Sequence, residues 1–155
     1  MQQTAVFPGS FDPFTLGHEN IVRRALPLFD EIIIAIGQNA NKNYYFALDK
    51  RMGWIKLLFK EEPKIRVELY SGLTVDFCKQ QKAAFIVRGL RNLSDFEFER
   101  SIAQMNAALN KNVETVFIMT ASELASISST IVRDIVRNGG DARQFVPQVI
   151  DLGYP

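Results

Sequence analysis

The sequence predicts an α/β protein built around a parallel sheet. Five short apolar runs alternate with longer segments in which apolar residues recur at helical spacing. The runs are apolar throughout, as expected when helices cover both faces of a sheet. Right-handed crossovers between them give a Rossmann-like, doubly wound, five-stranded parallel sheet. The expected strands are Thr4–Phe7, Ile32–Ile36, Ile65–Leu69, Phe85–Val87 and Val113–Ile118.

Helical patterns follow each strand. Pro8-Gly9 is expected to end the first strand, and apolar residues recur at helical spacing from His18 onward. Gly139-Gly140 is expected to end the last helix. The length and the 47% hydrophobic content fit one domain, residues 1–155, with a sizeable core. The later helices are expected at Leu48–Phe59, Thr74–Gln81, Phe96–Leu109 and Thr130–Asn138.

Composition and net charge limit the kinds of binding partner and the cellular compartment that are expected. The formal net charge is +1 and the basic residues are scattered, so nothing indicates nucleic acid, and small molecules are the expected partners. Cys78 is the only cysteine and no leader opens the chain, which favours a cytoplasmic location. No apolar stretch approaches the roughly 20 residues that span a bilayer, so no membrane association is expected.

The first strand leads into the segment Ser10–His18, which places the only histidine at an expected helix start. A helix N-terminus presents unpaired N–H groups and a positive dipole end, so an anion can be held there beside an imidazole. Gly17 would let the backbone approach that ligand closely. The alternative is that His18 only caps the helix or packs at its start. The segment therefore predicts a phosphate site.

Two further segments point to the same chemistry. Ser128, Ser129 and Thr130 follow an apolar strand and open a helix; capping explains one of these hydroxyls, whereas three, with Arg133 one turn later, suit a triphosphate. Arg88 and Arg91 stand just beyond another buried strand. Ligands of open parallel sheets bind at the carboxyl ends of strands, so both arginines are expected in the crevice of His18.

Missing motifs exclude other mechanisms. With one histidine and one cysteine a zinc site is not expected, and no protein side chains are expected to bind metal. The chain carries no G-x-x-x-x-G-K-[ST], G-x-G-x-x-G or G-x-S-x-G segment, which argues against a P-loop ATPase, a dinucleotide oxidoreductase and a serine hydrolase. Nucleotidyl transfer remains the best fit.

The three motifs in this order resemble the bacterial phosphopantetheine adenylyltransferase family over essentially the whole chain. Thr15-Leu16-Gly17-His18 is similar to the T-x-G-H form of the H-x-G-H signature of nucleotidyltransferases. The other matching segments are Pro8–Pro13, Arg88–Arg91 with Asp95–Glu99, and Ile127–Ser129.

The resemblance implies an enzyme that transfers the adenylyl group of ATP directly to 4′-phosphopantetheine, giving dephospho-coenzyme A and pyrophosphate. It implies Mg²⁺ with ATP, coenzyme A as a feedback inhibitor, and a homohexamer made of two trimers. His18 would stabilise the transition state. The acceptor would contact Ser10, Lys42, Thr74 and Arg88. ATP would contact Ser10, Phe11, His18, Gly89, Leu90, Arg91, Glu99, Leu124, Ala125, Ser126, Ile127, Ser128, Ser129 and Thr130.

Several positions also have a plain structural interpretation. Lys42 lies in a polar loop where lysines are usually only solvated, and Thr74 could serve as a helix-start residue. Asp95 is expected to be a solvated residue of a helix start, favoured by the dipole. Leu124 replaces the aromatic residue that relatives often carry beside adenine, and Ser10 replaces a frequent threonine.

Other functions remain open from the sequence. Nicotinamide mononucleotide adenylyltransferases and glycerol-phosphate cytidylyltransferases share the histidine loop, although the segment Arg88–Glu99 argues against both. A nucleotide-binding regulatory module that kept the pocket without turnover is the alternative outside enzymes. The joint presence of His18, Lys42, Arg91 and Ser129 argues against it.

Overall fold

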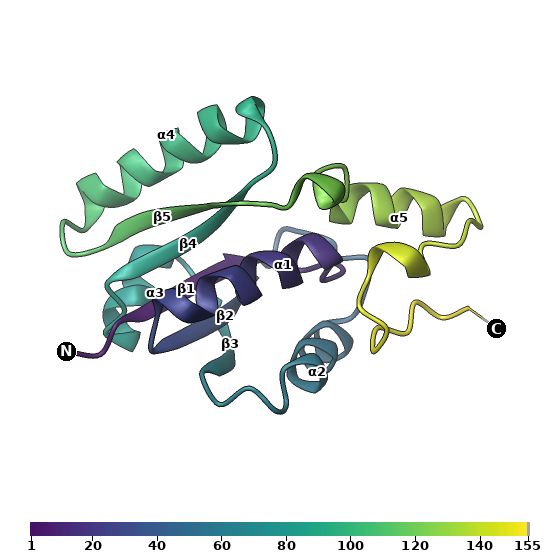
Figure 1. Cartoon of the computed structure of the whole chain (residues 1–155), viewed down its shortest axis with the longest axis horizontal. Coiled ribbons are helices and arrows are strands. Elements are labelled where there is room, and N and C mark those ends of the chain that lie inside the picture. Colours follow the sequence, from purple (N-terminus) through teal and green to yellow (C-terminus); the bar gives the residue numbers. More distant parts are fainter. Residues whose placement is uncertain (155) are drawn as a thin grey trace.

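The computed structural model describes residues 1–154, and it confirms the predicted parallel sheet (Figure 1). All pairings are parallel and the strand order is β3-β2-β1-β4-β5. The order reverses beside β1, so a crevice opens there at the carboxyl ends of the strands. The strands are β1 (Thr4–Gly9), β2 (Glu31–Gln38), β3 (Ile65–Ser71), β4 (Phe85–Leu90) and β5 (Glu114–Met119).

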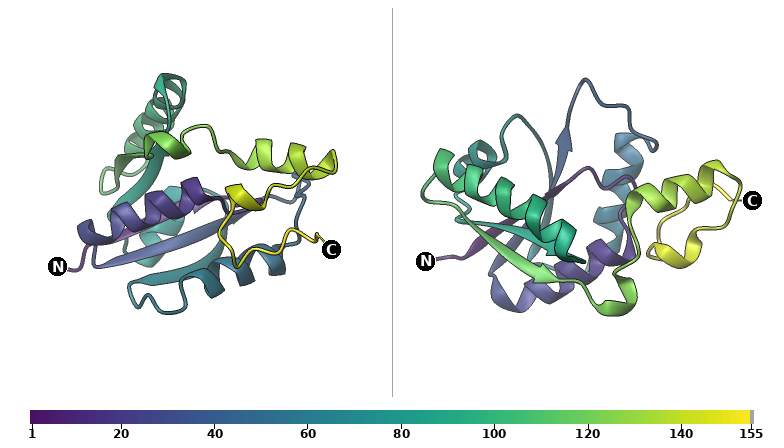
Figure 2. Two further views of the ribbon diagram at one scale, coloured as in Figure 1. Left: turned by 45° about the vertical axis from the view of Figure 1, so that its right-hand side comes forward. Right: turned by 90° about the horizontal axis from the view of Figure 1, so that it is seen from above.

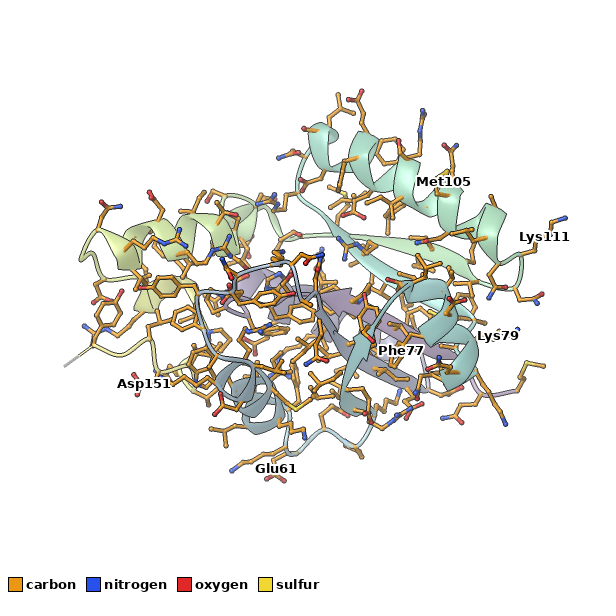
Figure 3. The ribbon with its side chains drawn as sticks, turned by 180° about the vertical axis from the view of Figure 1, so that it is seen from behind. Glu61, Phe77, Lys79, Met105, Lys111 and Asp151 are labelled. Atoms are coloured by element: carbon orange, nitrogen blue, oxygen red, sulfur yellow. The ribbon has the colours of Figure 1, made fainter. Side chains whose placement is uncertain are left out.

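The helices cover both faces of the sheet, as the apolar strands predict. Figure 1 shows α1 in front of the sheet and α3 behind it. In Figure 3, which views the molecule from behind, Phe77 lies on the sheet side of α3 and Lys79 on its outer side. The α-helices are α1 (Leu16–Ala25), α2 (Leu48–Leu58), α3 (Thr74–Gln81), α4 (Leu93–Leu109) and α5 (Ser129–Arg137).

Two cores follow from the alternation of side chains along the central strands. On β2, Ile32, Ile34 and Ile36 enter the larger core beneath α1 and α2, whereas Ile33 and Ala35 enter the smaller core beneath α3. All five are fully buried. A strand buried on both faces has to be apolar at every position, which explains the uninterrupted hydrophobic run in the sequence.

The expectation that Pro8-Gly9 ends the first strand is wrong, because both residues belong to β1 and pair with β2. The ladder between β1 and β4 ends at Val6. Beyond that point the strands diverge, and Arg88 Nη1 donates to the Pro8 carbonyl oxygen at 2.8 Å. The missing N–H of Pro8 is therefore not needed by a neighbouring strand.

Caps move two helix starts away from the expected positions. Thr15 caps α1, which begins at Leu16, before the expected His18. Asn92 accepts from the Asp95 N–H and starts α4 at Leu93, three residues before the expected Phe96.

The segment after α5 turns back toward α2 in both views of Figure 2. There Val146, Ile150 and Leu152 join the larger core. Tyr154 donates to the Gly140 carbonyl oxygen at 2.6 Å and fixes the turn. Within residues 1–154, none of the helices combines the length and the apolar character that crossing a membrane requires.

Candidate active site

A cavity of about 480 Å³ opens at the carboxyl ends of β1 and β4, where the sequence predicts a phosphate site. The starts of three helices border it. Thr15 and His18 come from α1, Arg91 and Asp95 from the start of α4, and Ser128 from the start of α5. Each helix start adds unpaired N–H groups and a positive dipole end. The cavity is therefore suited to a polyanion.

The loop from β1 to α1, residues 10–15, which we call the phosphate loop after the ligand that the sequence predicts for it, is held in place by aromatic packing. Phe11 has a left-handed backbone with φ of 50°, uncommon for a residue that is not glycine. Its ring lies 5.3 Å from that of Phe7 and 5.2 Å from that of Phe14, measured between centroids. A Cβ at Gly9 would come within 2.9 Å of the Phe11 ring, so the packing requires glycine there.

His18 caps α1 and also borders the cavity, so its capping role does not exclude a role in the site. Its Nδ1 accepts the backbone N–H of Thr15 at 2.9 Å, and the Thr15 hydroxyl accepts the His18 N–H at 3.4 Å. The Phe11 ring stands edge-on to the imidazole at 5.1 Å. Because Nδ1 is an acceptor, the neutral imidazole carries its proton on Nε2.

The surroundings keep that imidazole neutral. Burial, followed by the positive charges of Arg88 and Arg91, lowers the pKa of His18 from 6.5 to about 3. A neutral histidine with a fixed tautomer donates one hydrogen bond without adding charge or giving up its proton. His18 is thus suited to stabilise developing negative charge and is not suited to be a general acid.

The Arg88 side chain is held by Glu99 and by the end of β1. It donates to both carboxylate oxygens of Glu99, at 2.8 and 2.6 Å, and to the Pro8 carbonyl oxygen. Glu99 is 7% exposed and lies on α4. A bidentate pair of this kind fixes the guanidinium plane. Glu99, expected to contact ATP, is therefore engaged with Arg88 in this structure.

The Arg91 side chain is held by Asp95, a pairing that the sequence does not predict. Asp95 accepts from the Nε and Nη2 of Arg91 at 2.9 and 3.2 Å, and also from its backbone N–H at 2.9 Å. Burial raises the pKa of Asp95, but the hydrogen bonds from Arg91 outweigh it and hold that pKa below its usual value. The expectation of a merely solvated Asp95 is wrong, because the α4 start turns its side chain toward Arg91.

Each hydroxyl at the start of α5 has a partner within the protein. Ser128 accepts from the Ile131 N–H at 3.2 Å and is the cap. Ser129 donates to the Pro13 carbonyl oxygen at 2.8 Å, and Thr130 accepts from Arg133 at 3.2 Å. The bond from Ser129 ties α5 to the phosphate loop. All three residues also border the cavity.

A second cavity, of about 620 Å³, adjoins the first. Thr74 lines it from the start of α3, and its hydroxyl lies 2.9 Å from that of Tyr70. Both cavities share the walls formed by Ser10, Lys42 and Arg88. A phosphate at this boundary would therefore face both spaces.

The structure brings most, but not all, of the expected site residues to these cavities. Gly89 borders the first one, and a Cβ there would lie 2.8 Å from Ile21, so β4 and α1 approach closely at this glycine. The walls also include Arg133, which the sequence places beside a triphosphate, and two charged residues that the sequence does not indicate, Asp12 and Arg137. The expected ATP contacts that do not line either cavity are Leu90, Leu124, Ala125 and Ser126.

Of Asp12, Arg133 and Arg137, the sequence indicates only Arg133. Its Nη1 donates to the Asp12 carbonyl oxygen at 2.7 Å. Arg137 lies two turns into α5, beyond the hydroxyl-rich start that indicates the site. Its guanidinium carbon is 5.1 Å from the ring centroid of Tyr45. The available signal is that Arg133 and Arg137 are four positions apart in α5, a spacing that places both on one helix face.

A metal site made only of protein groups does not form in the part of the chain described. Among residues 1–154, His, Cys, Asp and Glu side chains do not gather in groups of three or more that could bind an ion. Asp95 and Glu99 instead accept hydrogen bonds from arginines. The donor set around the first cavity is cationic, so it fits a metal ion that comes with a polyphosphate.

Comparisons with known proteins agree with this geometry. The cytidylyltransferase-like family model matches residues 6–135. A protein of Flavobacterium johnsoniae named phosphopantetheine adenylyltransferase is 57% identical over 146 residues, 94% of this chain and 95% of the relative. One of Bacteroides thetaiotaomicron with the same name is 49% identical, over 96% of this chain and 97% of the relative.

Solved structures support the fold alone. A bifunctional NMN adenylyltransferase/ADP ribose pyrophosphatase from Francisella tularensis superposes with a TM-score of 0.68 at 18% identity, covering 94% of this chain and 45% of that one. The family model and the full-length relatives decide the family. The chain belongs to the phosphopantetheine adenylyltransferases, within the cytidylyltransferase-like family.

Proposed function

We propose that this protein transfers the adenylyl group of ATP to 4′-phosphopantetheine, giving dephospho-coenzyme A and pyrophosphate. The observation that carries the proposal is the junction of two cavities at Ser10, Lys42 and Arg88, next to His18. Transfer between two phosphates requires that both be held at one boundary. The relatives' names supply the identities of donor and acceptor.

ATP would occupy the first cavity. Its triphosphate would lie against the N-termini of α4 and α5, near Arg91, Ser129 and Thr130, with the α-phosphate beside His18. An oxygen of the acceptor phosphate attacks the α-phosphorus, a new P–O bond forms, and the bond to the pyrophosphate oxygen breaks. No protein nucleophile takes part. Catalysis rests on alignment and on donors directed at the charge of the transition state.

His18 would donate its Nε2 proton as a hydrogen bond to the α-phosphate. The lowered pKa supports this role, because a neutral donor stabilises the five-coordinate phosphorus without adding a proton to it. The contact from Thr15 to Nδ1 fixes the orientation of the ring. Kinetic variants of His18 test this role.

The acceptor would occupy the second cavity. Lys42, Ser10 and Arg88 would bind its phosphate, and Thr74 would line the path of the pantetheine arm. Lys42 Nζ donates to the Ser10 hydroxyl at 3.1 Å, so both are near one position. Glu99 supports the same end by holding Arg88. We therefore assign Glu99 to the orientation of Arg88 in place of the expected contact with ATP.

Magnesium fits this arrangement as a companion of ATP. The ion would neutralise charge on the triphosphate. The protein would contribute the cationic walls of Arg91 and Arg133, which leave room for an ion that is coordinated by phosphate oxygens. Coenzyme A, which contains the product, would compete for the same two cavities and act as a feedback inhibitor.

A homohexamer of two trimers in the cytoplasm is the proposed assembly. Exposed apolar side chains on α4 support it: Phe98, Met105 and Leu109 are 66%, 64% and 58% exposed. Met105 is labelled on α4 in Figure 3. Apolar surface of this extent on one helix is typical of a protein interface. Light scattering of the purified protein would measure the mass.

The proposed reaction is tested with ATP, Mg²⁺ and 4′-phosphopantetheine, by following pyrophosphate release and identifying the product by mass spectrometry. Nicotinamide mononucleotide serves as a parallel acceptor. Dephospho-coenzyme A as the sole product supports the proposal. Product from nicotinamide mononucleotide alone would overturn the acceptor assignment at Lys42, Thr74 and Arg88, and absence of turnover with both acceptors would favour a binding module.

A further inference from the structure

A buried arginine on α2 reaches the phosphate loop from below. Arg51 is 3% exposed, although it lies in a helix whose basic residues would ordinarily face solvent. Its Nη1 donates to the Ser10 carbonyl oxygen at 2.7 Å and its Nε to the Phe46 carbonyl oxygen at 2.9 Å. Burying a guanidinium is costly unless its donors find partners. Both of these partners belong to loops of the candidate site.

The same guanidinium is linked to Lys42 through one aromatic ring. The guanidinium carbon of Arg51 lies 4.2 Å from the ring centroid of Tyr44, and Lys42 Nζ lies 5.5 Å from the same centroid. Lys42 Nζ in turn donates to the Ser10 hydroxyl at 3.1 Å. Ser10, Lys42, Tyr44 and Arg51 thus form a closed circuit of contacts, which we call the Arg51 circuit.

The tyrosine also shapes the loop that carries Lys42. Its hydroxyl donates to the Gly37 carbonyl oxygen at 3.2 Å and accepts from the Asn39 N–H at 3.2 Å. The Lys42 N–H donates to the Asn39 carbonyl oxygen at 3.0 Å. The loop therefore has its ends fixed while the Lys42 side chain extends into solvent. Only the ring and Ser10 direct the ammonium toward the cavity.

A carboxylate fastens the phosphate loop to the same segment from its other side. Asp12 is 5% exposed, and its two oxygens accept the N–H groups of Tyr45 and Phe46 at 2.8 Å each. Asp12 and Arg51 therefore bind adjacent points of one segment, the former through N–H groups and the latter through a carbonyl oxygen. The loop that ends β1 and the loop that follows β2 are held as one unit.

We propose that Arg51 is a positioning residue, which through the Arg51 circuit holds Ser10 and Lys42 at the distance that one acceptor phosphate requires. The inference rests on the proposed function, because it assigns the acceptor side of that reaction. Arg51 itself touches no substrate. Without Arg51, Lys42 keeps its charge, but the Ser10 carbonyl oxygen loses its hydrogen bond and the Tyr44 ring loses the guanidinium that packs on it. Ser10 and Lys42 are then held less firmly, so the acceptor phosphate binds weakly and out of line for attack.

The test compares Arg51→Met with Arg66→Met. Arg66 is a matched control, because its guanidinium is also engaged with several side chains but lies on β3, outside both cavities. Arg51→Met should raise KM for 4′-phosphopantetheine by up to about tenfold, the effect of losing the contact of the Lys42 ammonium with the acceptor phosphate, with KM for ATP changed less than about threefold. Arg66→Met should change neither KM.

A second variant guards against a general loss of folding. Tyr44→Leu removes the ring from a partly exposed position and leaves the bonds of Arg51 intact. It should raise the acceptor KM by a smaller factor without raising KM for ATP, and the lost hydroxyl bonds to Gly37 and Asn39 should lower the thermal midpoint only slightly. Arg51→Lys, which retains a charge for one carbonyl oxygen, should fall between wild type and Arg51→Met. A structural role alone would lower the midpoint and affect both substrates equally.

The decisive measurement is a double-mutant cycle with Lys42→Ala. If Arg51 acts through Lys42, Arg51→Met adds less than about twofold to the acceptor KM in the Lys42→Ala background. Equal factors in both backgrounds would overturn the proposal.

Calorimetric titration with 4′-phosphopantetheine needs no turnover and separates the two failures. Wild-type binding that weakens in Arg51→Met, without any dephospho-coenzyme A formed, would refute the reaction and retain the positioning role. Normal turnover with unchanged acceptor binding in Arg51→Met would refute only the positioning role.

Discussion

The two sides of the cleft are held in different ways. On the nucleotide side, Arg91 pairs with Asp95 within one helix start, and Ser129 bonds directly to the phosphate loop. On the acceptor side, Lys42 is exposed on a loop and is directed by a buried arginine beneath it. The Arg91–Asp95 pair is local in sequence, although the bond from Ser129 reaches Pro13 across 116 positions. On the acceptor side, by contrast, the contacts that direct Lys42 join Ser10 to residues 32 and 41 positions away, and none of them is local. We therefore expect the orientation of Arg91 to tolerate distant substitutions better than that of Lys42.

Removing the donor on the nucleotide side should have the largest effect. His18→Ala should lower kcat by about 10²–10³, the usual cost of losing one transition-state donor, with little change in ATP affinity. Pyrophosphate release measures kcat, and nucleotide titration measures affinity. His18→Gln, which keeps a side-chain N–H donor, is the control and should retain more activity. Unchanged turnover in His18→Ala would rule out this role.

Substitution of Arg91, whose side chain Asp95 holds in place, should weaken ATP binding. Arg91→Met should raise KM for ATP by about 10- to 100-fold, because a hydrogen bond to a charged group is lost. Asp95→Asn keeps the charge of Arg91 and disturbs only its orientation, so its effect should be smaller. Initial rates at varied ATP measure both. A larger effect of Asp95→Asn than of Arg91→Met would contradict the arrangement.

On the other side of the cleft, Lys42→Ala should act on the acceptor. KM for 4′-phosphopantetheine should rise about tenfold. This is less than the rise in KM for ATP expected of Arg91→Met, because the ammonium is exposed to solvent and screened. KM for ATP should change little. Varying each substrate at saturating levels of the other separates the two. Equal losses for both substrates would show that Lys42 serves the whole cleft.

The smallest effect concerns pH. Since the pKa of His18 is lowered to about 3, the histidine stays neutral and kcat/KM for ATP should show no histidine limb between about pH 5 and 8. A limb near pH 6.5 that disappears in His18→Gln would contradict the neutral donor.

The same lowered pKa also affects stability. The unfolded chain takes up the histidine proton at a higher pH than the folded one, so the stabilisation is complete above about pH 6.5 and is lost as the pH falls toward 3. Thermal midpoints of wild type and His18→Gln across this range measure the difference.

Much of the site could be predicted from the sequence, because its strongest signals are local. The capped start at Thr15-Leu16-Gly17-His18 and the hydroxyls Ser128–Thr130 lie where strand, loop and helix follow one another in the chain. Asp95 was misjudged because a carboxylate at a helix start has an ordinary explanation in the dipole. Its partner Arg91 is four residues away, but the pairing depends on how the chain turns between β4 and α4.

The sequence by itself determined the parallel sheet, the order of its elements and the family, because strand burial on both faces imposes uninterrupted apolar runs and because the phosphate motifs are contiguous. Only the tertiary structure decided that Pro8 lies within β1, that Glu99 holds Arg88, and that Arg51 lies beneath Ser10. Those facts depend on contacts between residues 11 to 80 positions apart, and they follow from packing of β1, α2 and α4 around one crevice. The residues next to each position in the chain do not indicate such contacts.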